Sequence, residues 1–134
     1  MYEMSIDGAG QEERVRYALM SGLCCSQAIA KLCLEDLGKE NDELVAAMKA
    51  FCDGMGEGKI CGAIAAAVAM LYVSDDPVDD PVRMQRDLMD WFYDRFGGLD
   101  CEELVHDDPL RKIEFCPGCV IETYFKLRDD FLGI

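Results

Sequence analysis

Eight cysteines are the residues best able to do chemistry in this 134-residue chain. Four of them stand at the cap or in the first turn of a predicted helix: Cys25, Cys61, Cys101 and Cys116. A helix start offers unpaired N–H groups and the positive end of the helix dipole, which lower the pKa of a thiol. A cysteine that only packs has no reason to favour helix starts. We therefore predict that these four meet at one site.

Three of the remaining cysteines are in different settings. Cys33 and Cys52 lie on apolar stripes in mid-helix, so we predict that both belong to the core. Cys24 directly precedes Cys25 and could form a strained disulfide with it, although one thiol of such a pair more often only packs. Cys24 stays a possible extra ligand of the site.

Cys119 completes a Cys-Pro-Gly-Cys sequence with Cys116, which is the spacing of dithiol redox centres. The chain lacks the βαβ pattern that a thioredoxin-like enzyme needs. A second Cys-x-x-Cys and a Cys-x-x-Cys-His are both missing, which excludes a zinc ribbon and covalent haem attachment. Cys119 is thus a further candidate for the site, and the single histidine, His106, is expected at the surface.

A glycine-rich loop precedes the most apolar stretch of the chain. Alternating glycines suit a loop with positive φ angles that brings backbone N–H groups near sulfur, as in anion-binding nests. With one glycine after Cys61 they form the predicted cofactor-binding set: Gly54, Gly56, Gly58 and Gly62. Residues 60–73 that follow carry no charge and are rich in alanine, so they predict a buried central helix. At about 21 Å this helix is too short to span a bilayer.

Cys61 begins this central helix and is the predicted centre of the site. Burial raises the pKa of a thiol, whereas a helix start and N–H donors lower it. We expect the lowering to prevail, which predicts a thiolate at Cys61.

The other elements needed to position the cysteines also read as helices. Their predicted ranges are 11–21, 24–37, a third helix capped by Asn41, 80–96, 100–105, and a last helix from Cys116-Pro117 to about Phe131, after a connector at 106–115. Residues 1–10 are weakly patterned and are expected to be flexible. No strand pattern or domain boundary is convincing. The sequence predicts an all-α, compact single-domain bundle over 1–134, with about five to seven helices around the central one.

The net charge of the chain restricts the classes of partner that it can bind. The net charge of −14 repels nucleic-acid phosphates and anionic lipid, so neither nucleic acid nor a membrane is expected as a partner. The paired acids lack EF-hand spacing and suit a solvated surface. The first ten residues contain no basic residue, which does not suggest export and favours the cytoplasm. Many cysteines in that compartment favour metal or redox chemistry over a disulfide scaffold.

The surroundings of the four cysteines resemble the C_GCAxxG_C_C family of redox-active proteins. The matching residues are Cys25-Ser26-Gln27-Ala28, Gly54-Met55-Gly56 with Cys61-Gly62-Ala63, Phe96-Gly97 with Cys101 and Leu104, and Cys116 with Val120. The chain departs from the family pattern at Ala66, where a glycine is usual, at Cys24, where an asparagine is common, and by the addition of Cys119. The resemblance implies this fold, this site and a redox role. A similar domain in split-Soret cytochromes favours electron transfer with a metal centre.

Three functions stay open at this point. In the first, a cytoplasmic electron-transfer protein holds an iron–sulfur cluster on Cys25, Cys61, Cys101 and Cys116 and serves an unknown redox partner protein. In the second, the same cysteines act without metal as a thiol–disulfide oxidoreductase. In the third, the chain is a non-catalytic helical interaction module, with a homodimer as one form, whose thiols only pack. The sequence does not decide whether the protein is an enzyme.

Overall fold

The computed structural model describes residues 2–106 and 108–133, and side chains from residue 10 onward. Within these residues the chain is all-α, with seven α-helices and no strand, which confirms the predicted fold class. The helices are α1 (Tyr2–Met20), α2 (Cys25–Asp36), α3 (Asp42–Ala47), α4 (Gly62–Leu71), α5 (Pro81–Phe96), α6 (Cys101–Val105) and α7 (Pro109–Lys126). Shorter turns are η1 (Met48–Phe51), the glycine loop η2 (Gly54–Gly58) and η3 (Leu127–Leu132). None of the helices in these residues combines the length and apolar composition of a membrane span.

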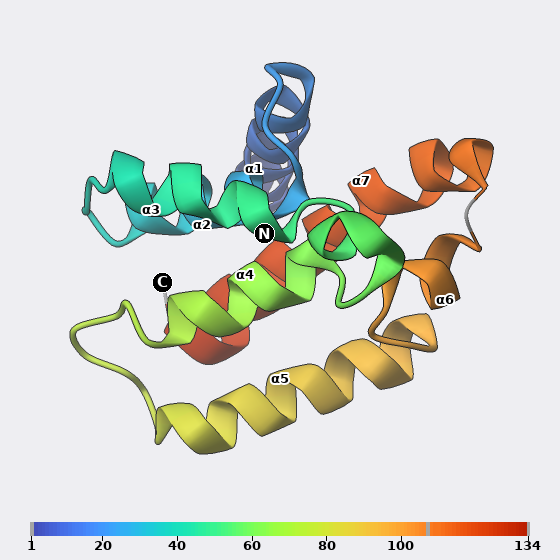
Figure 1. Cartoon of the computed structure of the whole chain (residues 1–134). Coiled ribbons are helices and arrows are strands. Elements are labelled where there is room, and N and C mark those ends of the chain that lie inside the picture. Colours follow the sequence, from blue (N-terminus) through green and yellow to red (C-terminus); the bar gives the residue numbers. More distant parts are fainter. Residues whose placement is uncertain (1, 107, 134) are drawn as a thin grey trace.

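Helix α4 lies at the centre of the molecule, as the charge-free stretch predicts. It packs against α2, α5 and α7 (Figure 1). Ala63, Ala66 and Ala67 are fully buried. Because alanine side chains are short, the neighbouring helices approach α4 closely. The start of α4 is therefore held between elements that are far apart in sequence.

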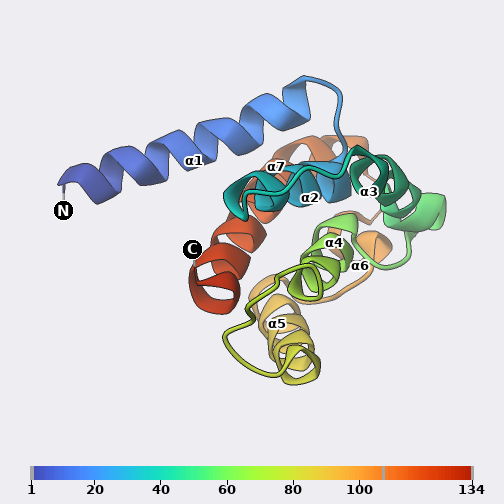
Figure 2. The ribbon, with the colours of Figure 1, turned by 90° about the vertical axis from the view of Figure 1, so that its left-hand side faces the viewer.

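The remaining helices surround α4 in layers. Figure 2 shows α1 at one side, α5 at the opposite side, and α2, α7 and α4 between them. Val15 and Ala18 of α1 are buried, and α1 contacts α2 and α7. The predicted start of this helix at residue 11 is wrong, because α1 begins at Tyr2. Gly8 and Gly10 lower helix propensity by about 1 kcal/mol each but do not forbid a helix. The expected flexibility of residues 1–10 stays a prediction, and Met1 lies outside the described residues.

Side-chain caps start three helices where the sequence indicates. Asn41 accepts a hydrogen bond from the Leu44 N–H at 3.0 Å, and Asp80 accepts one from the Val82 N–H at 3.1 Å. Asp100 forms a capping box with Glu103 at the start of α6. These local signals place Cys101 at the first position of α6, as predicted.

The last helix corrects the sequence analysis. Helix α7 begins at Pro109, because Asp108 accepts a hydrogen bond from the Leu110 N–H at 3.0 Å and proline suits the first helical position. Pro117 then lies inside the helix, where a proline typically costs about 3 kcal/mol. Burial of Val120 and Tyr124, one and two turns later, offsets that cost. Cys116 is therefore a mid-helix residue and is not at a helix start.

Candidate thiol site

Five free cysteines line one small cavity, which we call the thiol cavity. They are Cys25, Cys61, Cys101, Cys116 and Cys119. The cavity has a volume of about 30 Å³, which leaves room for about two water molecules. The structure thus brings together the four cysteines expected at one site and adds Cys119, which is 2% exposed. Its position one turn after Cys116 on α7 was the signal for it in the sequence.

A short backbone bridge fixes two of these cysteines side by side. The Cys61 N–H donates to the Leu99 carbonyl, and the Cys101 N–H donates to the Lys59 carbonyl, each at 2.7 Å. These bonds form an isolated antiparallel bridge between the segments before α4 and α6. A bridge of this length has no alternating pattern, so sequence reasoning missed it. It holds Cys61, the cap residue of α4, close to Cys101, the first residue of α6.

Gly62 lets a third cysteine join them. A Cβ at this position would lie 2.8 Å from both the Cys25 Sγ and the Phe51 carbonyl oxygen. Those distances are shorter than packed atoms tolerate, so only glycine lets α2 and α4 meet with the Cys25 sulfur between them. The Gly62 N–H also hydrogen-bonds to the Cys101 sulfur. The expectation that Gly62 helps to bind a cofactor stays a prediction.

The glycine loop has positive φ angles, as expected, but its N–H groups have other partners. Gly54, Gly56 and Gly58 have φ angles of +61°, +75° and +70°. The Gly56 N–H donates to the Cys52 carbonyl and the Gly58 N–H to the Asp53 carbonyl. The prediction of an N–H nest for sulfur is wrong for these two glycines, because the loop satisfies its own backbone. Gly56 and Gly58 instead form one wall of a larger groove.

The thiol of Cys61 contacts three other cysteines. It hydrogen-bonds to Cys101, Cys119 and Cys25, and these three bonds together with burial raise its pKa. The expected thiolate at Cys61 is therefore wrong. Cys61 has one S–H proton, which it can donate to only one of these sulfurs at a time. Neighbouring sulfurs that accept this proton favour the protonated form of Cys61, and this effect outweighs the helix start.

Cys25 and Cys101 have the opposite electrostatic environment. The hydrogen bond from Cys61 lowers the pKa of Cys25 to about 7, and the Ser26 N–H and the charge of Lys112 act in the same direction against burial. The bond from Cys61 also lowers the pKa of Cys101, with the Gly62 N–H adding to it. Both cysteines begin helices, so the reasoning from helix starts holds for these two.

Cys116 lacks these donors. Burial raises its pKa to about 11, and the neighbouring thiols Cys25, Cys119 and Cys101 add to the rise, while Lys112 opposes it. This agrees with its place in the middle of α7, away from a helix start. A cysteine of this set can therefore lie close to the other thiols without having a lowered pKa.

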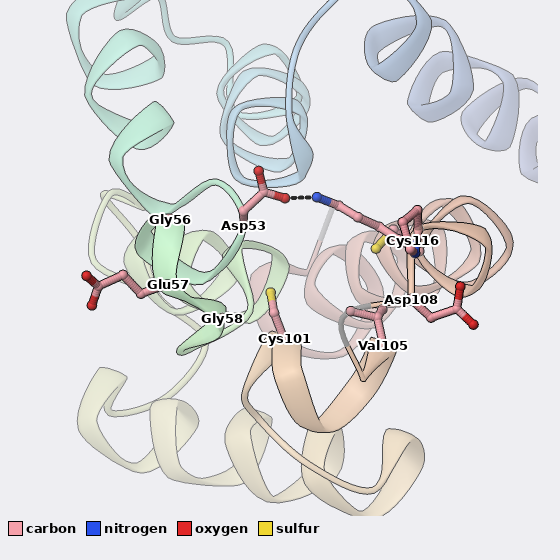
Figure 3. Close-up of a pocket in the computed structure, with 10 residues that line it drawn as sticks. Asp53, Gly56, Glu57, Gly58, Cys101, Val105, Asp108 and Cys116 are labelled. Atoms are coloured by element: carbon pink, nitrogen blue, oxygen red, sulfur yellow. Dashed lines mark ion pairs between the residues drawn. The ribbon is translucent and has the colours of Figure 1, made fainter.

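A groove of about 500 Å³ lies beside the thiol cavity (Figure 3). We call it the outer groove; its lining residues are Asp53, Gly56, Glu57, Gly58, Cys101, Val105, Asp108, Pro109, Lys112 and Cys116. Lys112 forms an ion pair with Asp53, drawn as a dashed line in Figure 3. Cys101 and Cys116 line both the groove and the cavity. The other three cysteines line the cavity only.

The family model described as "Putative redox-active protein (C_GCAxxG_C_C)" matches residues 23–129. The chain belongs to this family. The matched range includes all five cysteines of the thiol cavity, so the protein is a cysteine-containing member of a redox-active family. No curated protein and no solved structure matches it.

Two cysteines of this C_GCAxxG_C_C protein form a disulfide instead of lying in the cavity. Cys24 is bonded to Cys52, with their Cα atoms 5.9 Å apart. The expectation that Cys52 is a core thiol is wrong. Cys24 does not pair with Cys25, and its sulfur, held in this disulfide, is not free to act as the possible extra ligand of the site. Packing of η1 against α2 brings the two residues together across 28 positions of sequence, a contact with no local signal. Cys33 is fully buried in the core, as predicted.

His106 has no part in the cavity of this protein. It is exposed and closes α6 with a φ of 52°. A surface position was predicted for it.

The sulfurs of this C_GCAxxG_C_C protein share one cavity but are not spaced as metal ligands. Among the described residues, no group of three or more histidine, cysteine, aspartate or glutamate side chains is arranged to hold a metal ion. The thiols radiate from Cys61, and a cavity of about 30 Å³ is far smaller than an iron–sulfur cluster with its ligands. The expected cluster does not fit this arrangement unless the sulfurs move apart.

Proposed function

We propose that this protein carries out thiol–disulfide exchange, with Cys61 as the central thiol. The observation that carries the proposal is the contact of one protonated thiol with three others, Cys101, Cys119 and Cys25. Each contact is a pair that oxidation can join. Two of the three partners have lowered pKa values, so they supply the thiolate that such exchange requires.

Cys101 is the residue that meets a substrate first. It lines the outer groove and has a lowered pKa. Its thiolate attacks one sulfur of an incoming disulfide, forms a mixed disulfide and releases the first substrate thiolate. Cys61 then passes its proton to the neighbouring Cys25 thiolate and attacks the Cys101 sulfur, which releases the second substrate thiolate. Two electrons pass to the substrate, and the protein is left with a disulfide between Cys61 and Cys101.

The two other contacts of Cys61 allow the disulfide to move further into the protein. Cys25 and Cys119 can attack the Cys61 sulfur in turn, so the disulfide can move within the thiol cavity. Such a set of thiols would hold an oxidised pair away from solvent until a reductant arrives.

The test is disulfide mapping on protein purified without oxygen and freed of metal. One equivalent of a small disulfide is added to the reduced protein, and the new bonds are located by peptide mass spectrometry. We expect bonds that contain Cys61, with Cys101 as the main partner. Oxidation that produces no bond to Cys61 would refute the proposal.

A second candidate is electron transfer through an iron–sulfur centre. It is favoured by the number of soft sulfur ligands, five cysteines from α2, the start of α4, α6 and α7, on one cavity. Cys25, Cys61, Cys101 and Cys116 would hold the centre, with Cys119 as an alternative ligand. Stoichiometric iron and sulfide after anaerobic purification would favour this function over exchange. Either activity requires a redox partner protein, and we propose that the two meet in the cytoplasm.

A further inference from the structure

The outer groove is much larger than the thiol cavity, and most of the residues that line it carry no thiol. One wall is the glycine loop with Asp53, and the other is the start of α7 with Asp108, Pro109 and Lys112. Figure 3 shows Cys101 and Val105 of α6 between these walls. A volume of about 500 Å³ lies within the range of ligand-binding pockets. The groove is therefore large enough to hold several side chains above the two cysteines that it reaches.

The charges along the groove are mostly negative. Asp53, Glu57 and Asp108 supply carboxylates, and Lys112 is the one cation among the described lining residues. Lys112 forms an ion pair with Asp53. Lys112 therefore does not neutralise the carboxylates of Glu57 and Asp108. Together with the net charge of −14, this field favours a cationic ligand and repels an anionic one.

Two exposed apolar residues are next in sequence to residues that line the groove. Met55, which is 57% exposed, precedes Gly56 in the glycine loop, and Ile113, which is 71% exposed, follows Lys112 on α7. Exposed apolar residues near charged ones are typical of surfaces that bind a polypeptide. A small cation would not need them, whereas a peptide segment would cover them.

We propose that the outer groove binds a basic segment of a partner protein and presents its disulfide to Cys101. This inference rests on the proposed thiol–disulfide exchange and names its substrate class. The groove holds the basic side chains beside Glu57 and Asp108, and Met55 and Ile113 contact the apolar part of the segment. The Cys101 sulfur forms a bond to one sulfur of the partner while the partner's S–S bond breaks. The Cys61 sulfur then bonds to Cys101, the mixed disulfide breaks and the partner leaves with both its thiols reduced, so that two electrons have passed to it.

The first experiment compares three small disulfides of different charge on the reduced full chain. Cystamine is cationic, bis(2-hydroxyethyl) disulfide is neutral and 3,3′-dithiodipropionate is anionic. Exchange rates are measured by stopped flow at low and high salt. We expect cystamine to react roughly tenfold faster than the anionic disulfide at low salt, with a smaller ratio at high salt.

Matched variants separate the groove from the overall charge. Glu57→Gln with Asp108→Asn removes two charges at the groove, and asparagine keeps the capping acceptor at position 108. Asp87→Asn with Asp90→Asn removes two charges from the exposed surface of α5. We expect the groove variant to lose most of the roughly tenfold charge preference, about threefold for each carboxylate, and the α5 variant to keep it.

A second experiment distinguishes a protein segment from a free small cation. A lysine-flanked peptide disulfide is compared with cystamine on the Ile113→Ser variant. We expect the rate with the peptide to fall and the rate with cystamine to stay unchanged. Equal effects on both probes would overturn the assignment to a protein segment.

The outcomes keep the two proposals apart. If the neutral disulfide reacts but charge has no effect, or the α5 variant loses the preference as much as the groove variant, the groove proposal is wrong and exchange stands. If none of the three disulfides reacts with the thiol cavity, exchange fails and the groove proposal fails with it.

Discussion

Cys25 and Cys33 lie on the same helix, two turns apart, and behave in opposite ways. Cys33 is fully buried among apolar side chains, and burial raises the pKa of its thiol. Cys25 is also largely shielded, yet its pKa falls to about 7, because the Cys61 thiol and the Ser26 N–H donate to its sulfur. Burial alone therefore does not decide the acidity of these thiols. The donors that a helix start and a neighbouring cysteine provide make the difference.

The sharpest way to break this comparison is to remove the central sulfur. Cys61→Ser takes away the sulfur that resolves the mixed disulfide at Cys101, so we expect that mixed disulfide to persist, the second substrate thiolate to stay bound and helical content to be unchanged. Thiol reactivity, disulfide mapping and circular dichroism measure this.

The control for that variant is Cys33→Ser. A hydroxyl without a partner in the core costs roughly 1–3 kcal/mol, so this variant loses stability and keeps exchange. If Cys33→Ser loses exchange while Cys61→Ser keeps it, our division into site and core cysteines is wrong.

The next effect concerns the disulfide beside Cys25. Replacing both Cys24 and Cys52 by serine opens a link across 28 positions, which is expected to cost roughly 3–4 kcal/mol of unfolding free energy. Exchange should persist, because the donors to Cys25 come from Cys61 and Ser26. Urea denaturation of the oxidised protein and of the double variant measures the loss. Equal midpoints for the two proteins would show that the disulfide does not form in solution.

Patterns of a few adjacent residues were sufficient to predict part of this fold. The caps at Asn41, Asp80 and Asp100 and the charge-free run of α4 each depend on a few adjacent residues, and all were predicted. The Asp100 cap and the charge-free run place Cys101 and Cys61 at the starts of α6 and α4.

The errors concern contacts between distant segments or competing local signals. Asp108-Pro109 and Cys116-Pro117 both look like helix starts, and only the burial of the following turns shows that the helix continues through Pro117. The link from Cys24 to Cys52 depends on how η1 packs on α2. The protonated state of Cys61 depends on three sulfurs from other segments, which no pattern around residue 61 reveals.

A smaller change tests the close approach that surrounds Cys25. Gly62→Ala places a methyl group 2.8 Å from the Cys25 Sγ and from the Phe51 carbonyl oxygen, so the helices must separate at a cost of roughly 1–3 kcal/mol. We expect slower exchange as well, because the Cys25 sulfur is displaced from Cys61. Thermal unfolding and exchange rates on the purified variant measure both effects.

Gly118→Ala is the matched control, because a Cβ there meets no atom within 4 Å and the residue lies inside α7. It should raise stability by roughly 0.5–1 kcal/mol and leave exchange unchanged. If Gly62→Ala and Gly118→Ala changed stability and exchange rate equally, Gly62 would have no special role in the close approach of α2 and α4.

The smallest expected effect is a dependence of stability on pH with opposite signs for the two cysteines of α2. The pKa of Cys25 is lowered from its ordinary value of 9.0 to about 7, so between pH 7 and 9 the folded protein has lost a proton that the unfolded chain keeps. Stability therefore rises with pH in this window, by less than about 1.4 kcal/mol for each pH unit. The pKa of Cys33 is raised, so above pH 9 the unfolded chain ionises first and stability falls.

Urea denaturation of the reduced, metal-free protein from pH 6 to pH 10 measures both limbs of this curve. Cys25→Ser should flatten the rise between pH 7 and 9, while Cys101, whose pKa is also lowered, keeps part of it. Cys33→Ala should reduce only the fall above pH 9, because alanine cannot ionise in either state, while Cys61 and Cys116, whose pKa values are also raised, keep part of it. A rise that persists in full without Cys25 would mean that the donors from Cys61 and Ser26 do not hold its thiolate, and the contrast within α2 would then rest on burial alone.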